Sequence, residues 1–88
     1  MILIKKIDSN HFSIKISNNT ITTHNIILDD DDYFKYNLKN ISREKLVKAS
    51  FMFLLDREPN TSILKNFNLK IINNYFPEYN KKIGGYFD

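Results

Sequence analysis

Apolar and polar residues alternate in the first third of the chain, with the two-residue period of half-buried β-strands. The alternation is clearest in residues 12–17, FSIKIS, and β-rich runs precede it at 2–7 and follow it at 20–28. Turn-forming residues separate the runs at 8–10 and at 18–19. The pattern predicts a three-stranded antiparallel meander that leaves one face for another element to cover.

Four aspartates, Asp29 to Asp32, follow the third predicted strand. Acidic residues are favoured in the first turn of a helix through capping and the helix dipole. The pattern predicts a short helix or turn that lays aromatic rings against the sheet. Its apolar residues are Tyr33, Phe34, Tyr36 and Leu38.

The strongest helical pattern covers residues 43–56. Ser42 is a good N-cap residue and Glu44 lies in the first turn. At 100° per residue, apolar side chains cover well over half of the helix circumference, which is typical of a buried central helix. Pro59 disfavours helical geometry at Glu58, so the helix is expected to end near Asp56 or Arg57.

Two shorter helical segments are predicted after Pro59. Asn60 or Thr61 can cap a turn, and Asn68 can cap a second helix that Pro77 ends. The first would carry Ile63, Leu64 and Phe67, and the second Leu69, Ile72 and Phe76. Residues 80–88, which include Gly84-Gly85, are expected to fray. The prediction is therefore one compact α+β domain over residues 1–88, with a three-stranded meander, a long buried helix at about 43–56 and two short C-terminal helices.

Composition excludes several classes of protein. The 88 residues contain no cysteine, which excludes disulfides, thiol catalysis and Cys-ligated zinc. The apolar run at the start is short for a signal peptide, and no apolar window approaches the ~20 residues of a membrane span. We therefore expect a cytoplasmic protein with no membrane contact and no cofactor.

The net charge of +3 raises the question of nucleic-acid binding. The excess lies in the second half, because residues 1–41 hold five Lys and five Asp. Arg is the better residue for forked recognition of phosphate or guanine, and it occurs only at Arg43 and Arg57. The many Lys, Asn and Ile residues also fit an AT-rich coding sequence, so the charge is a weak indicator of phosphate binding.

The second half, SFMFLLDREPNTSILKNF followed by INNYFPEY, resembles a group of small uncharacterised bacterial proteins. Their shared pattern is FLLxREP, then SIL, a Phe and a closing YFP. Here it falls on residues 53–59, 62–64, 67 and 75–77, within a match of roughly 42–79. The resemblance implies a single compact domain in a bacterial family and implies no activity.

Arg57 and Glu58 have two interpretations. As a site, a fixed Arg beside a carboxylate can clamp an anionic ligand or a partner's carboxylate. As a structural corner, Arg57 would bind the carbonyl groups that end the long helix, and Glu58 would accept from N–H groups that begin the next one. We favour the structural corner, because Asp56 is the only other titratable residue beside the pair.

The sequence gives little support for a metal site or for catalysis. His11 and His24 could approach each other across the meander, but a structural site needs further ligands. The run Asp29 to Asp32 lacks the alternating spacing, the glycine and the distal Glu of a calcium loop. The chain has no Gly-rich phosphate loop and no nucleophile elbow, so we predict a protein that is not an enzyme.

Two functions stay open. The first is a protein-interaction or accessory module, including a homodimer formed through a free sheet edge. It is favoured by more aromatic residues near the C-terminus than a small core needs, namely Tyr75, Tyr79, Tyr86 and Phe87. The alternative is nucleic-acid binding by a helix-turn-helix over 61–76, with base or phosphate contacts from Lys65, Lys70, Asn73 and Asn74.

Overall fold

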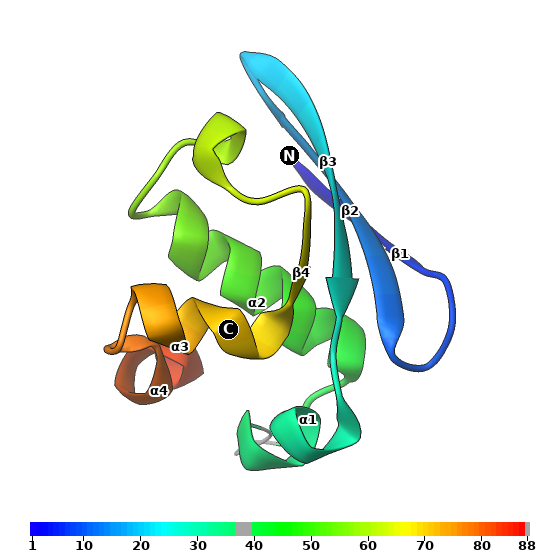
Figure 1. The fold of residues 1–88 in the computed structure, drawn as a ribbon, viewed down its shortest axis with the longest axis vertical. Coiled ribbons are helices and arrows are strands. Elements are labelled where there is room, and N and C mark those ends of the chain that lie inside the picture. Colours follow the sequence, from blue (N-terminus) through cyan, green and yellow to red (C-terminus); the bar gives the residue numbers. More distant parts are fainter. Residues whose placement is uncertain (37–39, 88) are drawn as a thin grey trace.

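A computed structural model describes residues 1–36 and 40–87 (Figure 1). Its regular elements, in chain order, are β1 (Ile2–Lys6), β2 (His11–Asn18), β3 (Thr20–Ile27), α1 (Asp30–Tyr36), α2 (Arg43–Leu55), the 3-10 helix η1 (Asn60–Ser62), β4 (Asn66–Asn68), η2 (Leu69–Ile71), α3 (Ile72–Tyr75), α4 (Tyr79–Lys82) and η3 (Ile83–Tyr86). The predicted α+β class, with an N-terminal antiparallel meander packed by a long helix, is confirmed.

The meander forms as its alternation predicts. Phe12, Ile14 and Ile16 of β2 are buried on one face of the sheet, while Ser13 and Lys15 lie on the other. The turn between β2 and β3 is tight, because Asn19 has φ 64°, a left-handed conformation that Asn tolerates better than most residues. One face of the sheet is therefore free to pack on the helices, which lie to one side of it in Figure 1.

Helix α2 supplies most of the helical part of the core. It begins after Ser42, whose Oγ accepts a hydrogen bond from the Lys45 backbone N–H at 3.1 Å. Its buried residues occupy most of its circumference, as the sequence predicts; they are Leu46, Val47, Ala49, Ser50, Phe51, Phe53 and Leu54. The helix ends at Leu55, one residue before the predicted end.

The predicted helix after the aspartates is also present. Asp30, Asp31 and Asp32 form the first turn of α1, and Tyr36 is buried at its end. Asp30 is paired with Arg43 of α2 at 2.8 Å, so the acidic turn is tied to the start of the long helix. Leu38, which the sequence assigns to the same segment, lies outside the described residues.

A fourth strand corrects the prediction for residues 60–68. The predicted helical turn bearing Ile63, Leu64 and Phe67 is wrong, because only Asn60–Ser62 is helical and Ile63 is extended. Phe67 instead lies in β4, which pairs with β3 in parallel, Ile26 opposite Phe67. The Asn25 N–H donates to Lys65 O at 2.7 Å, so this segment satisfies backbone groups along the edge of β3. Within the described sheet, β1 and β4 are the two edge strands, and β1 is the longer of them with five residues against three.

The C-terminal segment is a second correction. The predicted fraying of residues 80–88 does not hold through residue 87, because α4 and η3 are folded and Ile83 and Phe87 are buried. Tyr79 is buried as well, and its hydroxyl lies 2.6 Å from Ser50 Oγ of α2. Burial raises the pKa of Tyr79, so the hydroxyl is neutral. Ser50 Oγ donates its hydrogen to Leu46 O, so the Tyr79 hydroxyl is the donor to Ser50. Asp88 lies outside the described residues.

Candidate functional site

Arg57 closes the corner that follows α2. Its Nη1 donates to Phe53 O at 3.1 Å, and its Nε donates to Glu78 Oε2 at 2.9 Å. The guanidinium also stacks over the Phe53 ring, 3.6 Å from the ring centre. The hydrogen bond from Arg57 lowers the pKa of Glu78. These contacts support the interpretation of Arg57 as a structural residue that joins the end of α2 to α4.

Glu58 does not have the structural role that the sequence predicts for it. The carboxylate gives η1 no capping hydrogen bond, and the residue at the N-cap is Pro59. Glu58 is half-buried, and within the described parts of the chain it forms no side-chain hydrogen bond or ion pair. Arg57 and Glu58 are therefore neighbours in sequence with separate surroundings.

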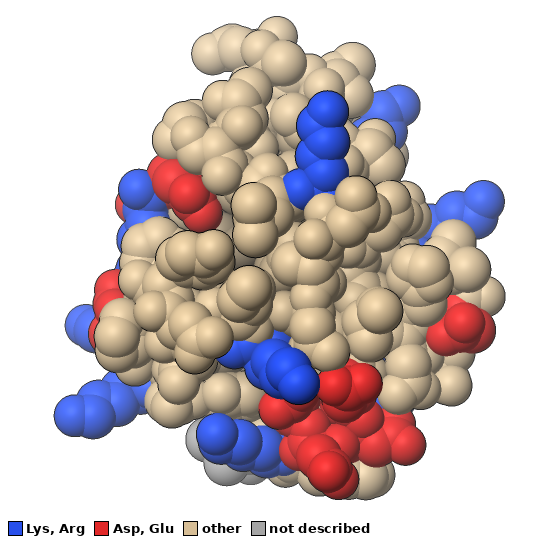
Figure 2. Space-filling model, viewed as in Figure 1, with Lys and Arg blue, Asp and Glu red and all other residues tan. Residues whose placement is uncertain are grey.

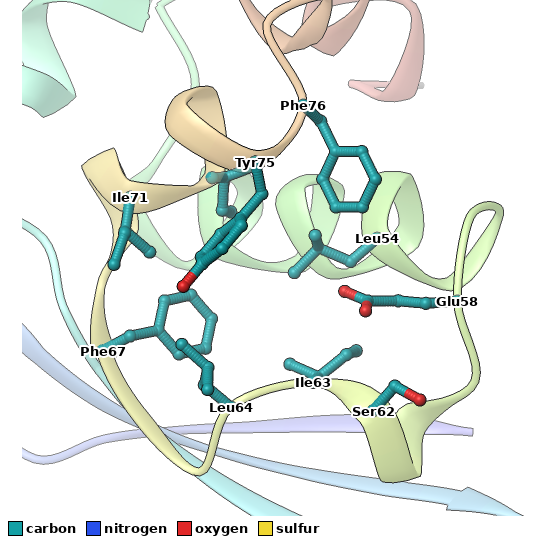
Figure 3. A pocket seen from close by; sticks show the side chains of 10 residues that line it. Leu54, Glu58, Ser62, Ile63, Leu64, Phe67, Ile71, Tyr75 and Phe76 are labelled. Carbon is teal, nitrogen blue, oxygen red and sulfur yellow. The ribbon is translucent and has the colours of Figure 1, made fainter.

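An open cleft of about 310 Å³ lies beside Glu58 (Figure 3). Figure 3 shows the carboxylate of Glu58 pointing into it between Leu54 and Ile63, while Tyr75 and Phe67 lie toward the other end. The lining comes from the end of α2, the segment after η1, β4 and α3; it comprises Leu54, Glu58, Ser62, Ile63, Leu64, Phe67, Ile71, Ile72, Tyr75 and Phe76. The volume is at the lower end of the roughly 300–1,000 Å³ of typical ligand sites.

Most of the side chains that line the cleft are apolar. Among the described residues that line it, Glu58 is the only one with a charge, and Ser62 and Tyr75 add hydroxyl groups. Burial raises the pKa of Glu58, because the apolar surroundings replace part of the water that would solvate its charge. The arrangement provides one poorly solvated acceptor at one end of an apolar surface.

Hydrogen bonds to β3 hold one wall of the cleft in place. Asn60 Nδ2 donates to Thr20 O at 2.9 Å and to Thr22 Oγ1 at 3.0 Å. His24 Nδ1 donates to Leu64 O at 2.7 Å, since a carbonyl oxygen can only accept. His24 Nε2 lies 2.9 Å from Thr22 Oγ1, so both ring nitrogens are engaged. Buried polar side chains thus position the segment that carries Ser62, Ile63 and Leu64.

Comparisons with family models, with curated proteins and with solved structures give no match. The resemblance of the second half to a bacterial group therefore stays a prediction. Among the described residues, no helix has both the length and the apolar character needed to cross a membrane.

The residues predicted to contact nucleic acid do not form a recognition helix. Asn73 and Asn74 lie in α3, which has four residues, and Lys70 lies in the preceding η2. The helix-turn-helix over 61–76 is wrong, because β4 occupies the place of its first helix. Lys70 and Asn74 are exposed, whereas Asn73 is half-buried with its Oδ1 enclosed. Lys65 is exposed in the segment before β4.

No aspartate or histidine is among the described residues that line the cleft. Figure 2 shows acidic side chains gathered over α1, where Asp29 to Asp32 and Lys70 line an open depression. His24 lies on the buried face of the sheet, and His11 is at an odd-numbered position of β2, on the opposite face. Within residues 1–36 and 40–87, no group of three His, Cys, Asp or Glu residues could hold a metal ion.

The sequence missed the cleft although it contained a partial signal. Leu64, Phe67, Ile71 and Tyr75 recur at intervals of three or four residues. The predicted surplus of aromatic residues is correct for Tyr75, which is 62% exposed, and wrong for Tyr79 and Phe87, which are buried. Only the fold shows that Leu64, Phe67, Ile71 and Tyr75 line the same cleft as Glu58.

Proposed function

We propose that the protein is a non-catalytic interaction module, and that it binds a short apolar segment of a protein partner in the cleft beside Glu58. The main support for the proposal is a cleft lined mostly by apolar side chains, with large side chains exposed to solvent at its rim. Tyr75 is 62% exposed and Leu64 is 46% exposed. Tyr is enriched in the centres of protein interfaces, where its ring gives contact area at low entropic cost.

A protein segment fits this cleft better than a metabolite does. The cleft is open and small, and few of the side chains that line it carry polar groups. Specific small-molecule sites bury most of their ligand and fix it with several converging polar groups. Peptide grooves instead take a few anchoring side chains along an apolar surface.

A homodimer formed by strand pairing would use the edge of β1. The edge of β3 is covered by β4 and by the segment before it, and β4 has only three residues, so β1 is the longer edge for the predicted homodimer. Leu3 is exposed on that strand, but Lys5 and Lys6 lie beside it. Lysines on an edge strand oppose pairing with a second copy. We therefore place the partner site at the cleft, in a protein that we propose to be cytoplasmic.

Replacing Tyr75 by Ala tests the proposal. The probe is the neutral peptide acetyl-Leu-Phe-norleucine-Leu-amide, and its affinity is measured by isothermal titration calorimetry. We expect Tyr75→Ala to weaken binding about 5- to 10-fold, because truncating an interface Tyr removes about 1 kcal/mol or more. Stability should change by less than about 0.5 kcal/mol, because the side chain is exposed.

Ile21→Ala is the matched control. Ile21 is 63% exposed, close to the 62% of Tyr75, and lies in β3 away from the cleft. The substitution should leave peptide affinity unchanged. Equal losses in the two variants, or no binding of the peptide to the unmodified protein, would argue against the cleft as the binding surface.

A further inference from the structure

We infer that the segment bound in the cleft carries a Lys or Arg side chain beside its apolar residues, and that Glu58 is the residue that selects it. The inference rests on the proposed function, since it names the chemistry of the partner at the same site. It concerns specificity, whereas the apolar lining accounts for binding itself.

The first support is the position of the charge. The carboxylate of Glu58 points into the cleft between Leu54 and Ile63 (Figure 3). Among the described lining residues no other side chain is charged. A ligand in the cleft therefore meets one negative charge at one end, where a cation is the complementary group.

The second support is that neighbouring cations cannot neutralise this carboxylate. Arg57 is adjacent in sequence, but its guanidinium is bound to Glu78, Phe53 O and the Tyr86 hydroxyl. The Glu58 carboxylate forms no hydrogen bond or ion pair with any of the described residues. Its acceptors are therefore available to a ligand.

The third support is energetic. Burial raises the pKa of Glu58, so the charged form is poorly solvated in the free protein. A ligand that covered the cleft would remove more water from the carboxylate. An apolar or acidic group placed there would leave the charge without a partner, whereas an ammonium or guanidinium would supply charge-assisted hydrogen bonds.

The apolar walls suit the remainder of such a side chain. Lys and Arg bury their methylene stems on apolar surface and keep the charged group at a polar site. Leu54 and Ile63 flank the Glu58 carboxylate and would contact the stem, while Phe67 and Tyr75 would take a neighbouring apolar side chain. The partner segment is therefore amphipathic and basic, despite the net charge of +3 on this protein.

Three matched peptides test the inference by calorimetry. They are acetyl-Leu-Phe-Xaa-Leu-amide with Lys, norleucine or Glu at Xaa, each titrated into the unmodified protein and into Glu58→Gln. With the unmodified protein we expect the Lys peptide to bind about 10-fold more tightly than the norleucine peptide, and the Glu peptide to bind most weakly. In Glu58→Gln the Lys and norleucine peptides should bind within about 2-fold of each other.

Glu44→Gln is the control, because it removes an exposed carboxylate from the first turn of α2 and changes net charge equally. It should keep the preference for Lys. The inference is overturned if norleucine binds as tightly as Lys, if the preference survives in Glu58→Gln, or if Glu44→Gln loses it too. Equal binding of all three peptides at the cleft would leave the proposed function standing, whereas no binding of any peptide would remove both.

Discussion

Removing residues 79–88 is expected to unfold the protein. The deletion takes three buried side chains from the core, Tyr79, Ile83 and Phe87. Large-to-small changes at buried positions each cost about 2–5 kcal/mol, so the loss is at least about 6 kcal/mol. A chain of this length has a total free energy of unfolding of about 4–13 kcal/mol.

Tyr79 makes the largest single contribution to this segment. Its ring packs edge-on against Phe53 and Tyr36, with centroids 5.2 and 5.1 Å apart. Its hydroxyl also bonds to Ser50, which in turn donates to Leu46 O at 2.8 Å. Tyr79→Ala alone should therefore lower the free energy of unfolding by about 3–5 kcal/mol.

Circular dichroism melts measure both changes. The deleted chain should show no cooperative transition, and Tyr79→Ala should melt far below the unmodified protein. The control is Lys81→Ala with Lys82→Ala, two exposed changes in the same helix, which should alter stability little. A deleted chain that still melts cooperatively within a few degrees of the full chain would show that the end of the chain frays, as its sequence predicts.

Arg57→Ala is expected to destabilise the protein, whereas Glu58→Gln is not. Arg57→Ala removes the bond to Phe53 O, the ion pair with Glu78 and the stacking on Phe53. We expect a loss of about 1–3 kcal/mol, or about 4–8 °C in Tm for each kcal/mol. Glu58→Gln removes a poorly solvated charge that has no partner among the described residues, so stability at pH 7 should stay equal or rise.

The pH dependence of the Glu58→Gln difference has a definite sign. The folded-state pKa of Glu58 is raised by burial, so between the unfolded and folded pKa values the native state binds more protons than the unfolded chain. This contribution to stability is present below the unfolded pKa of about 4.3 and is lost as pH rises through the folded pKa. Gln does not titrate, so the advantage of Glu58→Gln should grow from about pH 4 to pH 7.

Denaturant unfolding at several pH values measures the free energies of unfolding of Arg57→Ala and Glu58→Gln. Glu78→Ala is the control variant. Glu78 is the more exposed partner of Arg57, so losing it alone should cost little stability. If Glu58→Gln destabilised the protein as much as Arg57→Ala did, both residues would belong to the structural corner and the cleft would lose its free acceptor.

The parts of the fold that follow local patterns are predictable from sequence. The alternation at 12–17 and the Asn residues at 18–19 specify the meander, because a strand buries every second residue and a tight turn needs a residue that tolerates positive φ. The long helix is also predictable from local sequence, because the Ser42 cap and the apolar residues of 43–55 lie in one continuous stretch of the chain.

β4 could not be predicted from local pattern. It has three residues, and it pairs in parallel with β3, about forty positions earlier in the chain. What selects the extended conformation there is the edge of β3, whose backbone groups need partners. The spacing of Ile63, Leu64 and Phe67 fits a helix equally well, so periodicity alone favours the wrong conformation.

The candidate site was only half visible in the sequence. Arg57 and Glu58 stand out as charges between apolar runs, but their separate roles depend on distant residues. Glu78 of the C-terminal segment binds Arg57, and Phe67 and Tyr75 line the far end of the cleft that the Glu58 carboxylate enters. Gly84-Gly85 favour a frayed end when the local sequence is considered alone. The burial of the neighbouring Ile83 and Phe87 is a tertiary effect that the local sequence does not show.

The most direct test of the account is an amide chemical-shift map of the protein titrated with acetyl-Leu-Phe-Lys-Leu-amide. The account predicts that shift changes concentrate at residues 58, 62–64, 67, 71, 72, 75 and 76, which line the cleft, and that β1 and β2 change little. Changes centred on the free edge of β1, or on the outer face of the sheet, would contradict it.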